Sequence, residues 1–364
     1  MKAGGEPIGR RIIAAEADSR HTAAVSQLKQ AGWQQELARA VRDPLELLAL
    51  LDLTPEQIGS GETAASLLAA AEGFALRVPH SYIGRMRRGD PQDPLLRQVL
   101  PVGAERLPVA GYVADPLGEQ AVRATAGLLH KYHGRALLIT TGACAVHCRY
   151  CFRRHYDYAA DLDDGSAARW SAALEHVATD ASIEEVILSG GDPLSLGNAR
   201  LAQLLQQLQD IPHVQRIRIH TRTPIVLPER VDAGLLKALQ PVSARLAVVV
   251  HANHPAELDE ATRGALRELG SHCTTLLNQS VLLAGVNDDA AVLAALSARL
   301  FEAGVLPYYL HQLDYVAGAA HFAVSDTRAL ELHARLATLL PGYLLPRLVR
   351  ELSGATGKTP LHLA

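Results

Sequence analysis

Apolar residues recur at two different spacings along the chain, and the change of spacing divides it into two parts. From about His21 to Leu107 they return at helical intervals, and prolines punctuate the segment. One helical stripe comprises Leu37, Val41, Leu45, Leu48 and Leu51. From about Gly134 onward, short β-prone runs alternate with amphipathic stretches. We therefore predict an N-terminal helical domain over residues 1–108 and an α/β domain over 109–345, with a short C-terminal segment over 346–364.

The second part contains six candidate strands, each followed by polar residues and most by a helical pattern. They are Arg135–Thr140, Glu185–Ser189, Gln215–His220, Arg245–His251, Thr275–Leu283 and Leu306–Gln312. One amphipathic helix is expected over Asp288–Leu300. Strands that alternate with helices favour a parallel sheet with right-handed crossovers, and six strands are too few to close an eight-stranded barrel. The pattern therefore predicts an α/β fold, an incomplete (β/α)6 barrel.

The composition excludes several classes of protein. The 364 residues include only four cysteines, three of them within one short run, which is unlike a secreted disulfide framework. No apolar run approaches the length of a membrane span, and no charged segment followed by an apolar stretch opens the chain. The net charge is only −3, so neither nucleic acid nor a membrane is expected as a partner. We expect a soluble cytoplasmic protein.

The densest chemical signal is the run of Cys144, Cys148 and Cys151, with C-x3-C-x2-C spacing. Three thiolates can hold an iron-sulfur cluster and leave one iron open for a further ligand. The alternative is a structural zinc site with His147 or His155 as its fourth ligand, although zinc ligands usually come as two separated pairs. Cys273 lies far along the chain and is expected to be a small buried hydrophobe.

The polar residues that follow the strands should meet at one edge of the sheet, because the carboxyl ends of parallel strands lie together. The cysteine run follows the first strand, and Ser189-Gly190-Gly191-Asp192-Pro193 follows the second. The pentapeptide could be an ordinary turn, or its glycines could let the backbone approach a ligand closely. His220 and His251 end the third and fourth strands.

Four motifs together resemble the lysine 2,3-aminomutase family of radical S-adenosylmethionine (SAM) enzymes. They are the cysteine run continued through Phe152-Arg153-Arg154, the glycine-rich Leu188–Leu194, the segment Asn278–Asp288 and Pro307-Tyr308-Tyr309. The resemblance implies a [4Fe-4S] cluster on the three cysteines and SAM on the open iron. Ser189, Gly190, Gly191 and Asp192 are then expected to contact SAM, and His220 and His251 become candidates for its adenosine.

The same resemblance implies pyridoxal 5′-phosphate (PLP), joined to Lys358 in a late segment of small residues. A deoxyadenosyl radical would take a hydrogen from the β-carbon of lysine, and the amino group would move from the α- to the β-carbon. Without the resemblance, Lys358 would be interpreted as part of a solvated tail. Gly357-Lys358-Thr359 also imitates the end of a phosphate-binding P-loop, but Leu352 stands where that motif requires glycine.

The resemblance also assigns residues to substrate and cofactor. Arg153 is expected to hold the substrate carboxylate, and Asp288 and Glu351 its distant ammonium. Arg135 is expected to help bind the PLP phosphate. Asp288 could instead be a helix cap and Arg135 a charge at a strand edge. The resemblance implies aspartate at this position in the free-lysine enzymes; Glu351 keeps the charge but has a longer reach.

Within the family, the chain resembles the bacterial branch that makes (R)-β-lysine from (S)-α-lysine for modification of elongation factor P. The resemblance lies in Asp43–Leu48, Gly127–His133 and Thr359–Leu361, and in the absence of a cysteine-bearing C-terminal extension. It implies lysine as substrate, a functional link to the factor and its lysine ligase, and an external electron donor. The alternatives are an aminomutase for a free amino acid outside that pathway, a PLP-independent radical SAM enzyme that modifies RNA or protein, and a zinc-binding interaction module.

Overall fold

The computed structural model describes residues 32–161 and 170–361. The N-terminal part is helical as predicted, in short pieces: α2 (Trp33–Ala38), α3 (Pro44–Leu50), α4 (Pro55–Ile58), α5 (Ala64–Gly73), α6 (His80–Ile83) and α7 (Pro94–Arg97). The expected helical residues 21–31 lie outside the described part. In the described segments, no helix is long and apolar enough to cross a membrane.

The stripe predicted from Leu37 to Leu51 does not form one continuous helix. α2 ends at Ala38, and Val41 instead pairs with Val78 in an isolated antiparallel bridge. The Asp43 side chain then caps a new helix, α3, in which Pro44 occupies the first turn. Proline fits that position because the first turn has no partner for the missing N–H. The apolar residues still share one core, but they reach it from α2, from the Val41 bridge and from α3.

Ten strands form a single sheet whose spatial order follows the sequence. They are β1 (Arg123–Thr125), β2 (Leu128–Tyr132), β3 (Arg135–Thr141), β4 (Glu185–Gly190), β5 (Arg216–Thr221), β6 (Leu246–Val250), β7 (Thr275–Val281), β8 (Leu306–His311), β9 (Arg347–Arg350) and β10 (Thr359–Pro360). Strands β3 to β9 are parallel to their neighbours, while β1, β2 and β10 pair antiparallel at the two ends. The six predicted strands are β3 to β8, and their parallel arrangement is confirmed. The short strand β9 extends the parallel set beyond the prediction.

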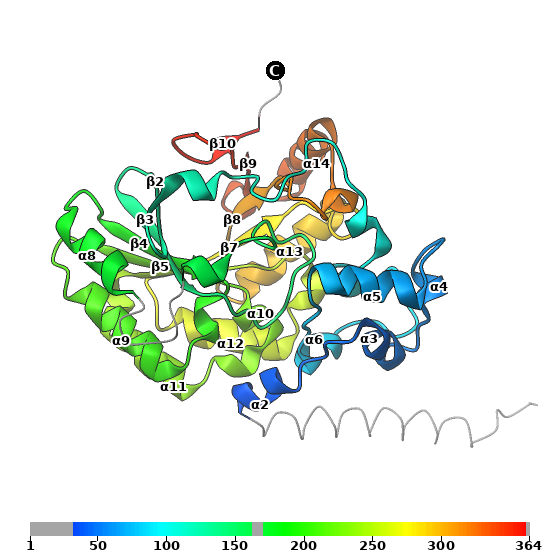
Figure 1. Ribbon diagram of the computed structural model, residues 1–364, viewed down its shortest axis with the longest axis horizontal. Coiled ribbons are helices and arrows are strands. Elements are labelled where there is room, and N and C mark those ends of the chain that lie inside the picture. Colours follow the sequence, from blue (N-terminus) through cyan, green and yellow to red (C-terminus); the bar gives the residue numbers. More distant parts are fainter. Residues whose placement is uncertain (1–31, 162–169, 362–364) are drawn as a thin grey trace, which may run out of the picture.

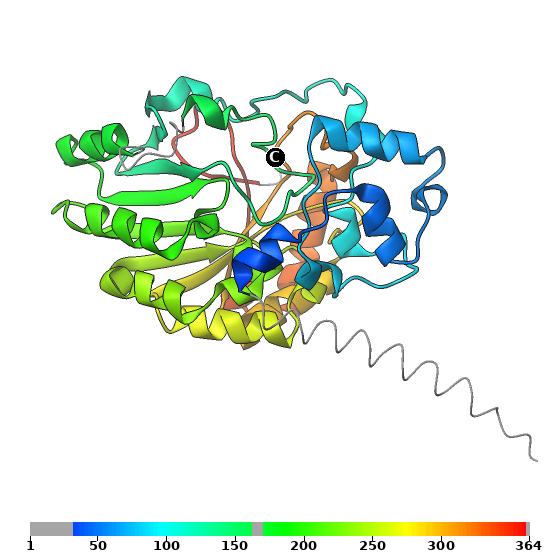
Figure 2. The same ribbon diagram turned by 60° about the horizontal axis from the view of Figure 1, so that its bottom comes forward.

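Helices connect the parallel strands. The longer ones are α8 (Ser171–Thr179), α9 (Asn198–Gln209), α11 (Ala233–Leu239), α12 (Glu260–Gly270), α13 (Ala290–Glu302) and α14 (Asp326–Leu339), with a single turn α10 (Thr223–Val226). Short 3-10 helices lie at Gly103–Arg106, Glu119–Val122, Tyr158–Ala160, Pro193–Ser195, Pro228–Arg230, Gln240–Arg245, Pro255–Glu257, Ala320–Phe322 and Gly342–Leu344. In Figure 1, α8, α9, α11 and α12 lie along one side of the strands. Figure 2 shows the N-terminal helices beside the sheet.

Side chains alternate between the two faces of the sheet, as the period of a strand requires. On β5, Ile217 and Ile219 belong to the core shared with the helices, whereas Arg218 and His220 point the other way. On β6, Val248 and Val250 belong to that core. The face away from the helices carries polar groups at the ends of these strands, such as His220 and His251, and this part of the face holds the candidate site.

The predicted C-terminal segment is a hairpin built into the sheet. Arg350 of β9 pairs with Thr359 of β10, and Val349 pairs with Pro360. Gly354 has a positive φ of 76° in the connecting loop, a conformation that glycine adopts without strain. This register brings the two ends of the loop, Glu351 and Lys358, opposite each other.

Candidate active site

The three cysteines occupy the loop that follows β3, and the glycine-rich motif packs directly against that loop. A side chain at Gly191 would come within 2.4 Å of the Ala143 carbonyl oxygen. The amide of Gly191 donates to the Thr141 carbonyl (2.6 Å), and the amide of Asp192 donates to the Ala143 carbonyl (2.8 Å). The glycines are therefore required for close contact between two backbones.

Asp192 ties this motif to the next strand. Its carboxylate accepts hydrogen bonds from the Thr221 hydroxyl (2.6 Å) and from the amides of Arg222 (2.7 Å) and Thr223 (2.9 Å). The polar ends of β3, β4 and β5 are thus fixed relative to one another, as the sequence predicted.

The spacing of the cysteine sulfurs disfavours the zinc alternative. Zinc bound tetrahedrally at about 2.3 Å from each sulfur would hold the sulfurs about 3.8 Å apart. Within the described segments, the cysteine thiols do not form a set lying within 4.8 Å of one another. The two histidines have other partners, because His147 contacts the Ala75 carbonyl and His155 the Ala317 carbonyl. The three half-buried thiols are free, and burial raises the pKa of Cys151 to about 11.

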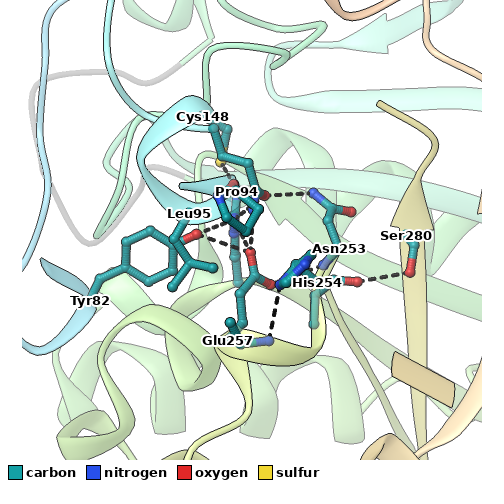
Figure 3. A network of polar contacts seen from close by, with 12 residues as sticks. Tyr82, Pro94, Leu95, Cys148, Asn253, His254, Glu257 and Ser280 are labelled. Atoms are coloured by element: carbon teal, nitrogen blue, oxygen red, sulfur yellow. Dashed lines mark hydrogen bonds and ion pairs between the residues drawn. The ribbon is translucent and has the colours of Figure 1, made fainter. Parts of the chain in front are cut away.

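A buried polar network stands behind Cys148. The Arg222 guanidinium donates to the Cys148 sulfur from Nη1 (2.7 Å) and to Glu257 Oε1 from Nη2 (2.9 Å). Figure 3 shows Tyr82 and Asn253 contacting Glu257, with Cys148 above them. Hydrogen bonds to cluster sulfurs and the charge around a cluster are main determinants of its reduction potential. Arg222 was expected at the end of a strand on this edge of the sheet, but its contact with Cys148 was not predicted.

Arg153 lies at the end of the cysteine loop, but a protein carboxylate already occupies most of its guanidinium. Nε donates to Glu119 Oε2 (2.8 Å) and Nη2 to Glu119 Oε1 (2.6 Å), and both residues are buried. Burial opposes the charge, yet Glu119 outweighs it and raises the pKa of Arg153. Nη1 remains, and it donates to the Ser189 hydroxyl (3.0 Å). Glu119 was not predicted as part of the site.

Lys358 and Glu351 form an ion pair across the end of the β9–β10 hairpin. The other carboxylate oxygen of Glu351 accepts from Lys131 Nζ (3.1 Å) and the Tyr132 hydroxyl (2.8 Å), both on β2. Burial would raise the pKa of Glu351, but Lys358, Lys131 and Tyr132 together lower it to about 2. The carboxylate is therefore ionised and shared between two ammonium groups.

The second predicted acid, Asp288, does not join this pair. Its carboxylate accepts from the Gly285 amide (2.9 Å) within a turn. Asp288 is not the helix cap considered as its alternative role, because Asp289 caps α13. In the described part of the chain, no hydrogen bond or ion pair connects Asp288 with Glu351 or Lys358.

Asp314, which follows β8, is instead the acid beside Glu351. Burial, reinforced by the Glu351 charge, raises the pKa of Asp314 to about 7, and Lys358 and Lys131 oppose the rise. Polar residues that follow a strand are expected at this edge of the sheet, and Asp314 follows the predicted strand Leu306–Gln312. The sequence therefore contained the information needed to identify Asp314.

The remaining predicted residues line the same polar face. His220 and His251 pack edge to face with ring centroids 5.8 Å apart. Burial is the main cause of the low pKa of both rings, and it lowers that of His251 to about 3, assisted by Arg222, Lys358 and Arg153. The Nε2 atoms of His220 and His311 are buried without a partner in the described structure.

Arg135 begins β3 and stacks on the Tyr132 ring, with its guanidinium carbon 4.7 Å from the ring centroid. That ring carries the hydroxyl that binds Glu351, so Arg135 adds a cation beside the Lys358 hairpin. Cys273, by contrast, packs against the apolar core as expected, but it is only partly buried.

The donor sets fit the expected groups. Three free thiols backed by a guanidinium suit a cluster with one open iron. A lysine amine with a cation on the neighbouring Tyr132 ring and the unpartnered Nε2 of His311 suits PLP. A parallel sheet with a three-cysteine loop after its first parallel strand and a glycine-rich turn after the second defines the radical SAM class of enzymes.

Comparison with known proteins gives the family. Residues 133–225 match the family described as a 4Fe-4S single cluster domain. The L-lysine 2,3-aminomutase of Escherichia coli is 48% identical over 94% of this chain and 98% of its own length. That of Haemophilus influenzae is 44% identical over 91% and 96%, and that of Clostridium subterminale 33% identical over 90% and 77%. The chain belongs to the L-lysine 2,3-aminomutase family, whose members use a [4Fe-4S] cluster, SAM and PLP.

Proposed function

We propose that the protein is an isomerase that converts (S)-α-lysine to (R)-β-lysine. The observation that carries the proposal is the Lys358–Glu351 pair, which lies on the polar face shared with the cysteine loop. Burial is the main cause of the low pKa of both His220 and His251, and Lys358 and Arg153 lower it further, so the hairpin and the cysteine loop face the same interior. When bound, the cluster and SAM supply a radical that abstracts hydrogen, and PLP supplies delocalisation for the migrating amino group.

The chain's own residues bind and orient these groups. Cys144, Cys148 and Cys151 hold the cluster, and the backbone and side chains of residues 189–192 contact SAM. His220 and His251 line the space for its adenosine. Their lowered pKa values keep both imidazoles neutral near pH 7, so they can donate or accept hydrogen bonds without adding charge.

At the other end of the site, Lys358 carries PLP and Arg135 supports its phosphate. Glu351 and Asp314 then receive the ε-ammonium of the substrate. Asp288 was expected in this role, and Asp314 replaces it because Asp314 is the acid whose pKa responds to Glu351, Lys358 and Lys131.

Arg153 is proposed to hold the substrate carboxylate through Nη1. Glu119 fixes the guanidinium plane, because it takes Nε and Nη2. Only Nη1 of the guanidinium is therefore left to face the substrate, and the two-nitrogen edge that binds a carboxylate through parallel hydrogen bonds is taken by Glu119.

We further propose that residues 109–345 form an incomplete (β/α)6 barrel, with a helical domain over 1–108 and the PLP lysine on 346–364. The higher identity to the Escherichia coli and Haemophilus influenzae relatives than to the Clostridium subterminale relative supports the branch that feeds elongation factor P and its lysine ligase. In that case the enzyme works in the cytoplasm with an external electron donor.

The test is anaerobic incubation of the reconstituted enzyme with SAM, PLP, a strong reductant and (S)-α-lysine, followed by chiral chromatography. We expect (R)-β-lysine from the wild type and none from Lys358→Ala. Release of 5′-deoxyadenosine without β-lysine would preserve the radical chemistry but reject lysine as the substrate. An aminomutase outside the elongation factor pathway would either give β-lysine of the other configuration or turn over another free amino acid faster than lysine.

A further inference from the structure

Outside the active site, three metal-ligating side chains converge at the edge of the sheet. His130 lies on β2, His176 on the last turn of α8, and Asp180 caps the C-terminus of α8. One ligand atom from each lies within 4.8 Å of the other two. Among the residues described, no other group of three or more histidine, cysteine or acidic side chains meets this distance.

The backbone places these three groups for a structural reason. His176 and Asp180 are four residues apart, so their side chains lie on the same face at the end of one helix. Leu128 on β2 and Ala173 and Val177 on α8 belong to one buried core, which packs the helix against the strand beneath. The His130 and His176 rings therefore meet edge to face, with centroids 6.2 Å apart.

The carboxylate of Asp180 is already oriented for a ligand. Its Oδ1 accepts from the Ser182 amide (3.0 Å) and the Ser182 hydroxyl (2.6 Å). Its Oδ2 is directed at His130 Nδ1, 3.8 Å away. Hydrogen bonds that hold the outer oxygen of a ligating carboxylate are typical of metal sites.

Neither charge nor access opposes a cation. In the described residues, the basic side chain nearest the Asp180 carboxylate is the His130 imidazole, 3.8 Å away, and no lysine or arginine forms an ion pair with Asp180. The side chains of His130 and Asp180 remain 22% and 35% exposed, so solvent can deliver an ion and supply a water as the fourth ligand. In zinc sites the nitrogen and oxygen ligands lie about 2.0–2.2 Å from the metal, and small side-chain rotations close the remaining gap.

We propose that His130, His176 and Asp180 form a site for zinc or a similar borderline divalent ion, separate from the cluster cysteines. Two imidazoles, one carboxylate and a water are a donor set that zinc favours. The bound ion would link β2 to the C-terminal end of α8. Because Lys131 and Tyr132, next to His130, both bind Glu351, it would steady the strand that supports the active site.

The test measures zinc on the full-length enzyme with its cluster already loaded, so that the three cysteines are occupied by iron. After incubation with zinc and gel filtration, metal analysis should give one zinc per chain in the wild type. His130→Gln and Asp180→Asn, which nearly preserve side-chain volume, should bind less than a tenth of this amount. Zinc should raise the Tm of the wild type but not of these variants.

His272→Ala is the matched control, because His272 also follows the end of a helix, α12, but lies away from this cluster. It should retain both the zinc and the shift in Tm. Iron content and circular dichroism establish that each variant is folded. A wild type that binds no zinc, or site variants that bind as much as the wild type, would overturn the proposal.

Discussion

Glu351 and Lys358 face each other as an ion pair one position beyond the last paired residues of the β9–β10 hairpin, Arg350 and Thr359. Glu351 and Lys358 are seven residues apart because the loop between them turns the chain back so that β10 pairs with β9. The lysine that carries PLP and the carboxylate proposed to receive the substrate ammonium are therefore held by one element. A substitution at either Glu351 or Lys358 should therefore affect both PLP attachment and recognition of the substrate ammonium.

Glu351→Gln should reduce kcat/KM for lysine by about 10- to 100-fold, mainly through KM. The amide keeps the shape but removes the charge, and a hydrogen bond to a charged group contributes about 1.5–3 kcal/mol. Steady-state kinetics with lysine measure the effect. Glu351→Asp is the control, since it keeps the charge and changes only the reach. Equal losses in both variants would show that geometry, and not charge, sets recognition at this position.

Asp314 should make lysine binding depend on pH near neutrality. Its pKa is raised to about 7, so the carboxyl is largely neutral below that pH and charged above it. Because only the charged form attracts the substrate ammonium, KM for lysine should rise as the pH falls through about 7. Initial rates across this range give the profile. In Asp314→Asn, KM for lysine should be high at every pH in this range. If KM in this variant still rises as the pH falls through about 7, another group is responsible for the pH dependence.

Arg222→Gln should make the cluster harder to reduce. The guanidinium donates to Cys148 and places a buried positive charge beside it, which favours the reduced cluster. A reductive titration monitored by electron paramagnetic resonance should give a more negative potential than in the wild type. Tyr82→Phe removes the hydroxyl that donates to Glu257 (3.0 Å) and accepts from Arg222 Nη2 (3.2 Å), but it leaves the Arg222 charge and its contact with Cys148 in place. If both variants lower the Tm and neither shifts the potential, Arg222 has only a structural role.

The strands and the cysteine loop could be predicted because their signals are local. Each buried strand is a short run of apolar residues bounded by glycine, proline or polar residues, and the loop is defined by eight consecutive positions. Patterns of neighbouring residues gave a wrong prediction where the structure depends on a contact between segments that are far apart in the sequence. The stripe through Val41 has helical spacing, yet Val41 pairs with Val78 in a bridge.

The same limit explains the missed site residues. Glu119 lies 34 residues before Arg153, and no pattern in either segment marks them as a pair. Strand β9 is only four residues long, too short for alternation to be recognised. Asp314 is different, because it follows a predicted strand and could have been found. Asp288 was chosen from the family motif, although its own neighbours, Gly285 and Asn287, are typical of a turn.

Glu119→Gln should destabilise the protein far more than an equivalent change at the surface. Removing one partner of a buried ion pair leaves an uncompensated charge, which costs about 3–5 kcal/mol. The Arg153–Glu119 pair is buried, whereas the Arg216–Glu184 pair is about half exposed, with an N–O distance of 3.0 Å. Glu184→Gln is therefore the matched control, with an expected loss of about 0–1 kcal/mol.

The measurement is urea unfolding of both variants under anaerobic conditions, with the free energy of unfolding taken from the midpoint and slope. If Glu119 also fixes the guanidinium plane, Glu119→Gln should raise KM for lysine while Glu184→Gln leaves it unchanged. A large loss of stability with normal KM would mean that Glu119 stabilises the fold without orienting Arg153. Similar, small losses in both variants would mean that the buried pair contributes no more than a surface one, and the positioning role assigned to Glu119 would then have no energetic basis.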